Sequence, residues 1–262
     1  MALTSKLVAM DLDGTLIQAN GSIPDSLLCI IKNLSRRGIK FAIVTGRMTE
    51  TAEKYAKIIG GASTISYNGS VVKKKNGTYV KKMIPLRSVR NMIKFCRINE
   101  LYLQMYHNGK IYASGKSSYL SSDPDSKMVE SQIIANFTKI KTHPTPKMII
   151  ASEEEKMPSL MEEIKEMFCT LYISRSSTQI IEVTPEGIDK KHGLNIVAED
   201  LGVDRSDVIA IGNDMNDLPM IEWAGTGIAV SNAPNELKNK ANIISKQTSS
   251  AGVQEALELI FH

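Results

Sequence analysis

The chain has 262 residues, of which 42% are hydrophobic and 23% charged, with a formal net charge of +4. This apolar fraction can form a core, which excludes a mainly disordered chain, and no apolar run approaches the ~18–20 residues of a membrane span. The weak positive charge predicts neither a nucleic-acid nor a membrane partner. The three distant cysteines fit no disulfide framework, and the first residues show no signal-peptide pattern, so we expect a cytoplasmic protein.

The first part of the chain alternates between strands and helices. A short apolar run at 7–10 ends at an aspartate, as expected of a buried parallel strand, and apolar residues then recur at helical spacing over 24–38. Further strands are predicted to end before Thr45 and over 64–68, with a helix over about 50–59 between them. This alternation predicts a parallel sheet with right-handed crossovers.

The middle of the chain has a different pattern. Asn-Gly pairs at 76–77 and 108–109 stand between strand-like runs and predict tight hairpins. The runs MIIAS, LYIS and QIIEVT predict more strands, with a helix over about 158–168. The parallel pattern returns after Gly187, with a helix over about 190–201 and a strand at 208–212.

These patterns together predict an α/β fold. We expect a doubly wound, Rossmann-like parallel-sheet domain made of residues 1–83 and 188–262. A smaller α+β domain, residues 84–187, is expected to be inserted into it.

Polar clusters follow three of the predicted parallel strands, at 11–15, 45–47 and 212–217. Ligands of open parallel sheets bind outside the carboxyl ends of the strands. If these strands are neighbours, the three clusters converge on one crevice. Lys190 opens the helix before the last of these strands and can point into the same crevice.

The residues of this crevice are suited to phosphoryl transfer. Asp11 and Asp13 would repel each other unless a cation or a proton lies between them, and Mg²⁺ is a cation that takes few carboxylates and completes its shell with water and phosphate oxygens. The Thr45 hydroxyl, the Gly46 N–H and the Lys190 ammonium could hold a phosphoryl group. Positioning and charge stabilisation are what phosphoryl transfer needs most.

Four motifs occur in order: DLDGT at 11–15, TGR at 45–47, VTPEGIDK at 183–190 and GNDMND at 212–217. They resemble the motifs of the haloacid dehalogenase-like (HAD) phosphatases. The large insertion between the second and third motifs resembles the Cof-type subfamily, which carries a type IIB α/β cap. The resemblance implies a Mg²⁺-dependent phosphoric monoester hydrolase that acts on small phosphorylated metabolites, such as a sugar phosphate, through an aspartyl-phosphate intermediate. The inserted domain would be the cap that sets substrate specificity.

The resemblance also assigns roles to individual residues. Asp11 would be the nucleophile and Asp13 the general acid–base, and the Asp11 carboxylate and Asp13 backbone carbonyl would bind Mg²⁺. The groups expected to contact phosphate are the Leu12 N–H, Thr45, Gly46, Lys190 and Asn216.

The last motif departs from the family pattern. The family has an aspartate metal ligand where this chain has Asn213. An amide oxygen can coordinate Mg²⁺ but adds no charge, so we expect a weaker metal affinity and a retained function. Asn213 itself, or Asp214 or Asp217 directly or through water, would complete the metal site.

Two other functions are compatible with the same motifs. One is a phosphotransferase or phosphomutase that passes the phosphoryl group to a sugar hydroxyl, and the other is a non-catalytic protein that binds phosphorylated metabolites. The expected partner in every case is a small phosphorylated metabolite, and the protein is expected to be a monomer or a homodimer.

Five lysines flank the hairpin at 76–77, namely Lys73, Lys74, Lys75, Lys81 and Lys82. The favoured interpretation is a solvated sheet edge that discourages aggregation. A second interpretation is that these lysines attract anionic substrates.

Overall fold

The computed structural model describes residues 6–116, 118–134 and 143–261. The chain divides into two compact units. We call Met1–Val80 with Asp189–His262 the core unit, and Lys81–Ile188 the inserted unit. Within the described residues, no helix has the length and apolar character needed to cross a membrane.

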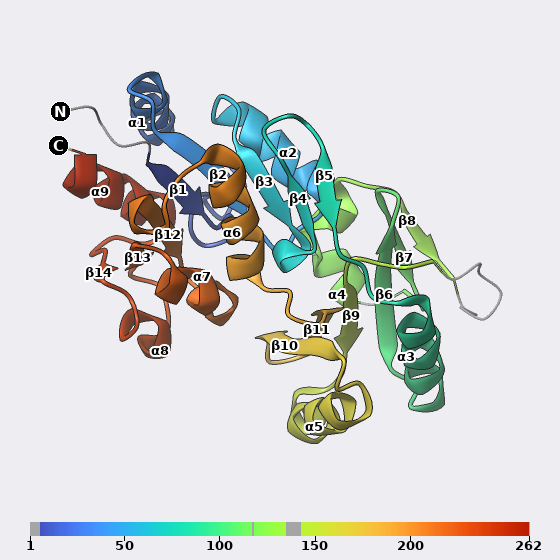
Figure 1. Cartoon of the computed structure of the whole chain (residues 1–262). Helices are drawn as coiled ribbons and strands as arrows, with labels where there is room; N and C mark the ends of the chain where they lie inside the picture. The colour runs from blue at the N-terminus through green and yellow to red at the C-terminus, as the bar shows by residue number, and fades with distance from the viewer. Residues whose placement is uncertain (1–5, 117, 135–142, 262) are drawn as a thin grey trace. The chain divides into compact units, whose positions relative to one another are not determined.

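The core unit is built on an eight-stranded sheet with the order β14-β13-β12-β1-β2-β3-β4-β5 (Figure 1). Neighbouring strands from β14 to β3 run parallel, and β4 is antiparallel to β3. The strands are β1 (Leu7–Met10), β2 (Lys40–Val44), β3 (Ser63–Ser66), β4 (Val71–Lys73), β5 (Tyr79–Lys81), β12 (Val208–Gly212), β13 (Thr226–Ala229) and β14 (Ile243–Ile244).

Helices cover both faces of the core sheet, because its central strands are apolar on both sides. In β1, Val8 and Met10 pack into one hydrophobic cluster, and Leu7 and Ala9 pack into a second one. The first cluster includes α1 (Asp25–Arg36), α2 (Thr49–Ile58) and α9 (Ser249–Phe261). The second includes α6 (Lys190–Leu201), α7 (Leu218–Trp223) and α8 (Asn235–Lys238).

The order of the sheet creates a topological switch point at β1. The chain leaves β1 for β2 on one side and later returns to β12 on the other side. In open α/β sheets a crevice forms outside the carboxyl ends of the strands at such a point. The polar clusters that follow β1, β2 and β12 therefore lie at one edge of the sheet.

The inserted unit has a six-stranded sheet with the order β10-β11-β9-β6-β7-β8 (Figure 1). All its neighbouring pairs are antiparallel except β7 with β8. Its strands are β6 (Tyr102–His107), β7 (Lys110–Ala113), β8 (Ser131–Ile133), β9 (Met148–Ala151), β10 (Leu171–Ser177) and β11 (Ile180–Pro185), and its helices are α3 (Leu86–Ile98), α4 (Ser118–Ser122) and α5 (Met157–Met167).

The structure confirms the α/β class and the parallel strand order expected for the first and last parts of the chain. Both Asn-Gly pairs form turns, one between β4 and β5 and one between β6 and β7. The units divide at Val80 and at Ile188, whereas the sequence placed the divisions after residues 83 and 187. The helix α3 was not predicted, although its buried residues Val89, Met92 and Cys96 have helical spacing.

Candidate active site

Asp11 lies directly after β1, at the switch point of the core sheet. Its backbone N–H donates to the Ile211 carbonyl (3.0 Å), which continues the pairing of β1 with β12. Strands on both sides and helices on both faces leave the Asp11 residue only 5% exposed. A carboxylate held in this way needs partners, because burial of an unpaired charge is costly.

Lys190 is the main partner of Asp11. It is the first residue of α6, a helix start that is fixed because the Asp189 carboxylate accepts the His192 N–H (2.8 Å). The Lys190 ammonium lies 2.7 Å from Asp11 Oδ1 and 2.5 Å from Asp217 Oδ1, and Lys190 is 1% exposed. One buried ammonium thus bridges two carboxylates that are far apart in the sequence.

Burial and mutual contact shift the pKa values of Asp11 and Lys190, which with Asp217 form a buried triad. Burial raises the pKa of Asp11 to about 7, with Lys190 opposing the rise and Asp217 adding to it. Burial by itself would lower the pKa of Lys190, but the carboxylates of Asp11 and Asp217 outweigh that effect and raise it. Lys190 therefore stays protonated, while Asp11 titrates close to neutral pH when no cation other than Lys190 is near it.

A close turn brings α6 to this edge of the sheet. Gly69 has a left-handed backbone (φ 105°), and a Cβ atom at this position would lie 2.2 Å from the Asp189 carbonyl oxygen. Only glycine allows this backbone conformation and this contact together. Gly69 thereby lets the first turn of α6 approach the end of β3.

Asp217 fixes the loop that follows β12. Its Oδ2 accepts the backbone N–H groups of Asn213 (2.8 Å) and Asp214 (3.0 Å), while its Oδ1 accepts from Lys190. The Asp214 side chain is directed elsewhere, since it accepts the Met215 N–H (2.7 Å) and caps the short 3₁₀ helix Met215–Asp217. Both carboxylates are therefore engaged in holding the loop.

Asn213 faces the first motif. Its Oδ1 accepts the Thr15 hydroxyl (2.7 Å), and the same end of the amide lies 2.7 Å from the Asp13 carbonyl oxygen and 3.2 Å from Asp11 Oδ2. Gly14 permits this approach, because a Cβ atom there would lie 2.6 Å from the Asn213 amide. Oxygens this close to one another repel unless the amide turns its N–H groups toward them or a cation lies among them.

The distances around this end of the Asn213 amide are those of N–H···O hydrogen bonds, so the amide nitrogen faces the Asp13 carbonyl and Asp11 Oδ2. If the amide turned its oxygen toward them, the three oxygens would be of the kind that Mg²⁺ prefers. The described residues contain no group of three or more His, Cys, Asp or Glu side chains that could hold a metal ion. A magnesium site here would therefore use one carboxylate from Asp11, the Asp13 carbonyl and the Asn213 amide.

The end of β2 lies beside the same site. Thr45 is buried, and its carbonyl accepts the Asn68 N–H (3.0 Å). The Asn68 Oδ1 faces Gly46, where a Cβ atom would lie 2.9 Å away, and it accepts from Asn216 Nδ2 (3.5 Å). The Asn216 Oδ1 is buried and has no hydrogen-bond partner among the residues that the structure describes. Asn68 thus links Gly46 to Asn216.

In the DLDGT motif, the Leu12 side chain is buried and the Asp13 side chain is half exposed. Leu12 is buried with the hydrophobic core, so only its backbone is placed to meet a ligand. The Asp13 side chain is 49% exposed and pairs with Arg47, whose Nε donates to Asp13 Oδ2 (2.7 Å) and whose second nitrogen donates to Asp13 Oδ1. Sequence reasoning gave Arg47 no role of its own, although its place in the TGR motif was a usable signal.

Comparison with known proteins extends these observations to a family. The haloacid dehalogenase-like hydrolase family matches residues 8–257. Stress response protein YhaX of Bacillus subtilis is 28% identical over 99% of this chain and 94% of its own length. The 5-amino-6-(5-phospho-D-ribitylamino)uracil phosphatase YcsE of Bacillus subtilis is 29% identical over 96% of this chain and 94% of its own length. A crystal structure of a haloacid dehalogenase-like hydrolase from Bacteroides thetaiotaomicron has a TM-score of 0.88 at 28% identity, covering 98% of this chain and 100% of that chain.

The family match spans nearly the whole chain, including all four motifs. The match in structure covers both sheets, so the core sheet and the inserted sheet are both features of the family fold. The chain therefore belongs to the haloacid dehalogenase-like hydrolase family, among its Cof-type phosphatases, and is a phosphoric monoester hydrolase.

Proposed function

We propose that this phosphatase hydrolyses small phosphorylated metabolites in a Mg²⁺-dependent reaction, with Asp11 as the nucleophile. The observation that carries the proposal is the environment of the Asp11 carboxylate. Lys190 contacts one of its oxygens at 2.7 Å, and the Asn213 amide lies 3.2 Å from the other. A buried carboxylate with a cation on one side and a metal-compatible oxygen set on the other is suited to attack an anionic phosphoryl group.

The first step forms a bond between an Asp11 carboxylate oxygen and phosphorus. The bond from phosphorus to the ester oxygen breaks, and Asp13 gives its proton to that leaving oxygen. In the second step Asp13 takes a proton from water, the water oxygen bonds to phosphorus, and the phosphorus–Asp11 bond breaks to release phosphate. Lys190 stays charged throughout and offsets the negative charge of the phosphoryl oxygens.

Mg²⁺ held by Asp11, the Asp13 carbonyl and Asn213 would offset further negative charge on the phosphoryl group. Asp217 would act through Lys190 and the loop, since both of its oxygens already accept hydrogen bonds. Thr45, Gly46, the Leu12 N–H and Asn216 would complete the phosphate contacts.

Arg47 adds a condition to this mechanism. The acid role requires the Asp13 carboxyl group to face the leaving group, whereas in the structure it faces Arg47. The pair therefore has to open during the reaction. Because half of the Asp13 side chain is exposed, this opening requires no unpacking of the core.

The substrate class is supported by the family and by one relative. YcsE is named as a phosphatase of a phosphorylated ribitylaminouracil, which is a small metabolite with a sugar-alcohol phosphate. We place the substrate of this chain in the same broad class of sugar phosphates and related phosphomonoesters. The inserted unit would act as the cap that chooses the leaving group.

The test measures phosphate release from p-nitrophenyl phosphate and from a panel of phosphorylated metabolites, with and without Mg²⁺. Asp11→Asn should lower turnover by at least about 10⁴-fold, because it removes the nucleophile and keeps the shape of the side chain. Asp25→Asn, on an exposed first turn of α1, is the matched control and should retain activity. Turnover that survives Asp11→Asn would refute the mechanism.

The same assays separate the alternative functions. A phosphotransferase or mutase would move label from one sugar phosphate to another sugar hydroxyl with little free phosphate. A non-catalytic binding protein would give no turnover with or without Mg²⁺. Hydrolysis that depends on both Mg²⁺ and Asp11 excludes both.

A further inference from the structure

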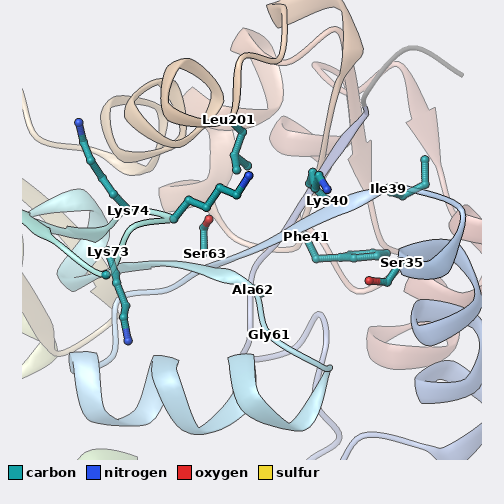
Figure 2. A pocket seen from close by; sticks show the side chains of 12 residues that line it. Ser35, Ile39, Lys40, Phe41, Gly61, Ala62, Ser63, Lys73, Lys74 and Leu201 are labelled. Carbon is teal, nitrogen blue, oxygen red and sulfur yellow. The ribbon is translucent and has the colours of Figure 1, made fainter. Parts of the chain in front are cut away.

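A second hollow lies in the core unit, away from the candidate active site. Its volume is about 340 Å³. Figure 2 shows that it is bordered by the starts of β2 and β3, the end of β4 and the last residue of α6. Known small-molecule sites begin at about 300 Å³, so this hollow is large enough for a small ligand.

The border of this hollow is strongly basic. Four lysines line it, namely Lys40, Lys73, Lys74 and Lys75. Lys73 is neutralised by Glu53 (3.0 Å) on α2, and Figure 2 shows its side chain directed away from Lys40. In the part of the chain that the structure describes, no carboxylate forms an ion pair with the ammonium groups of Lys40, Lys74 or Lys75.

A second carboxylate, Asp200, lies beside the lysines of the hollow. It accepts the backbone N–H of Lys75 (2.7 Å). With Glu53 it gives two negative charges against four positive charges around the hollow. Two positive charges therefore remain in excess among these groups, which favours an anionic ligand.

The interior of the hollow is not simply a charged surface. Phe41, Ile39 and Leu201 provide apolar walls, and the hydroxyl-bearing residues Ser35 and Ser63 also line it. Phosphate groups are bound by ammonium and hydroxyl donors, while the apolar walls can cover the carbon skeleton of a metabolite. A solvated edge that only prevents aggregation needs lysines but no such hollow.

The hollow and the candidate active site lie at opposite ends of β2. Lys40 begins β2, and Thr45 follows the other end of the same strand. Five residues of strand span roughly 16 Å at about 3.3 Å per residue, so a small ligand does not reach both ends. The second interpretation of these lysines was that they attract anionic substrates. Lys40, Lys73, Lys74 and Lys75 are poorly placed to guide a substrate to Asp11, because they lie at the opposite edge of the sheet.

We propose that this hollow is a second binding site, which takes a small polyanionic metabolite carrying at least two phosphate groups. Lys40, Lys74 and Lys75 would bind the phosphates, and Ser63 would donate a hydrogen bond. The proposal goes beyond the hydrolytic function and does not depend on it.

The first test is calorimetric titration of the intact protein with tripolyphosphate in a buffer that contains EDTA, so that no divalent metal recruits the probe to the candidate active site. The double variant Lys40→Gln with Lys74→Gln should weaken binding by at least about tenfold, because two ammonium contacts are lost. The matched control is Lys32→Gln with Lys246→Gln, two exposed lysines of the same unit that lie outside the hollow, and it should change the affinity less than twofold.

The second test locates the probe. Backbone amide signals of Gly61, Ser63 and Gly77 should shift on titration with tripolyphosphate, and those of Gly212 and Asn216 should not. Equal affinities of the two double variants, or shifts confined to Gly212 and Asn216, would overturn the proposal. Loss of phosphatase activity in Asp11→Asn would leave this result unchanged, so the two proposals fail independently.

Discussion

Each unit of the molecule contains a buried lysine, and the two lysines differ in what surrounds them. Lys190 of the core unit bridges Asp11 and Asp217, which come from two other segments of the chain. Lys147 of the inserted unit, 4% exposed, pairs with Glu182 (2.9 Å), and its ammonium lies 5.4 Å from the centre of the Tyr106 ring. The carboxylates of Asp123 and Asp125 also act on its charge and help to raise its pKa.

The sheet register explains the second cluster without any ligand. Lys147 directly precedes β9, and its partners come from the neighbouring strands β11 and β6. Such cross-strand pairs are ordinary contacts within an antiparallel sheet. Lys190 contacts two carboxylates directly, and these three groups carry one negative charge in excess when both carboxylates are ionised. This excess lies at the carboxyl edge of a parallel sheet, where it can attract a further cation, whereas Lys147 and its partner lie within an antiparallel sheet.

The largest expected difference concerns catalysis. Lys190→Met should lower kcat/KM on p-nitrophenyl phosphate by at least about 10³-fold, because it removes the buried charge that faces the phosphoryl group. Lys147→Met should lower it by less than about tenfold. Circular dichroism at the assay temperature checks that both variants are folded. If both variants were folded and lost the same factor in kcat/KM, Lys190 would have no special role in catalysis.

The pairing of Lys147 with Glu182 predicts an effect on stability. Lys147→Met leaves Glu182 buried without its cation and should lower the free energy of unfolding by about 3–5 kcal/mol, measured by urea denaturation. Adding Glu182→Leu should restore most of that loss, because an apolar pair can replace a buried ion pair. A double variant that is no more stable than Lys147→Met alone would argue against a purely structural pair.

The negative excess around Lys190 makes Mg²⁺ binding dependent on pH. Burial raises the pKa of Asp11 to about 7, so below pH 7 the metal must displace a proton from this carboxylate. The affinity for Mg²⁺ should therefore rise with pH up to about 7, by about tenfold per pH unit, and level off above it. Calorimetry in buffers of different ionisation enthalpy measures the protons released. A pH-independent affinity between pH 5 and 7 would contradict this assignment.

The smallest predicted effect concerns the unusual amide in the last motif. Asn213→Asp adds a charge beside Asp11 and the Asp13 carbonyl, and should tighten Mg²⁺ binding by about tenfold. Asp214→Asn is the control, because this side chain caps the 3₁₀ helix and should not change the affinity. If Asp214→Asn weakened Mg²⁺ binding and Asn213→Asp had no effect, Asp214 would be the ligand.

Much of the core fold could be predicted from local patterns. The apolar runs that became β1, β2 and β12 each end at a polar cluster, and the helix predicted from residue 190 begins there. Buried parallel strands leave such a clear signal because they are apolar on both faces. The helix α3 has the same kind of signal, because Val89, Met92 and Cys96 form a buried stripe and Arg90 and Lys94 lie on the exposed face, so its periodicity could have predicted it.

The contacts within the candidate site could be predicted less well. The spacing of the last motif left open whether Asn213, Asp214 or Asp217 completes the metal site. The folded structure adds the hydrogen-bond partners of Asp214 and Asp217, which no local pattern predicts. The TGR motif marks Arg47, but it does not indicate that Asp13 is its partner, because the two residues lie 34 positions apart and only folding brings them together.

The sequence by itself determined that strands and helices alternate, that polar motifs stand at the strand ends and that the chain belongs to a phosphatase family. Only the tertiary structure decided which carboxylate contacts Lys190, which amide faces Asp11, and that the lysines near β4 border a hollow at the opposite edge of the sheet. Periodicity reports which face of an element is buried. The direction of each polar side chain depends on partners that distant segments bring within hydrogen-bond distance, and only the packed structure supplies those partners.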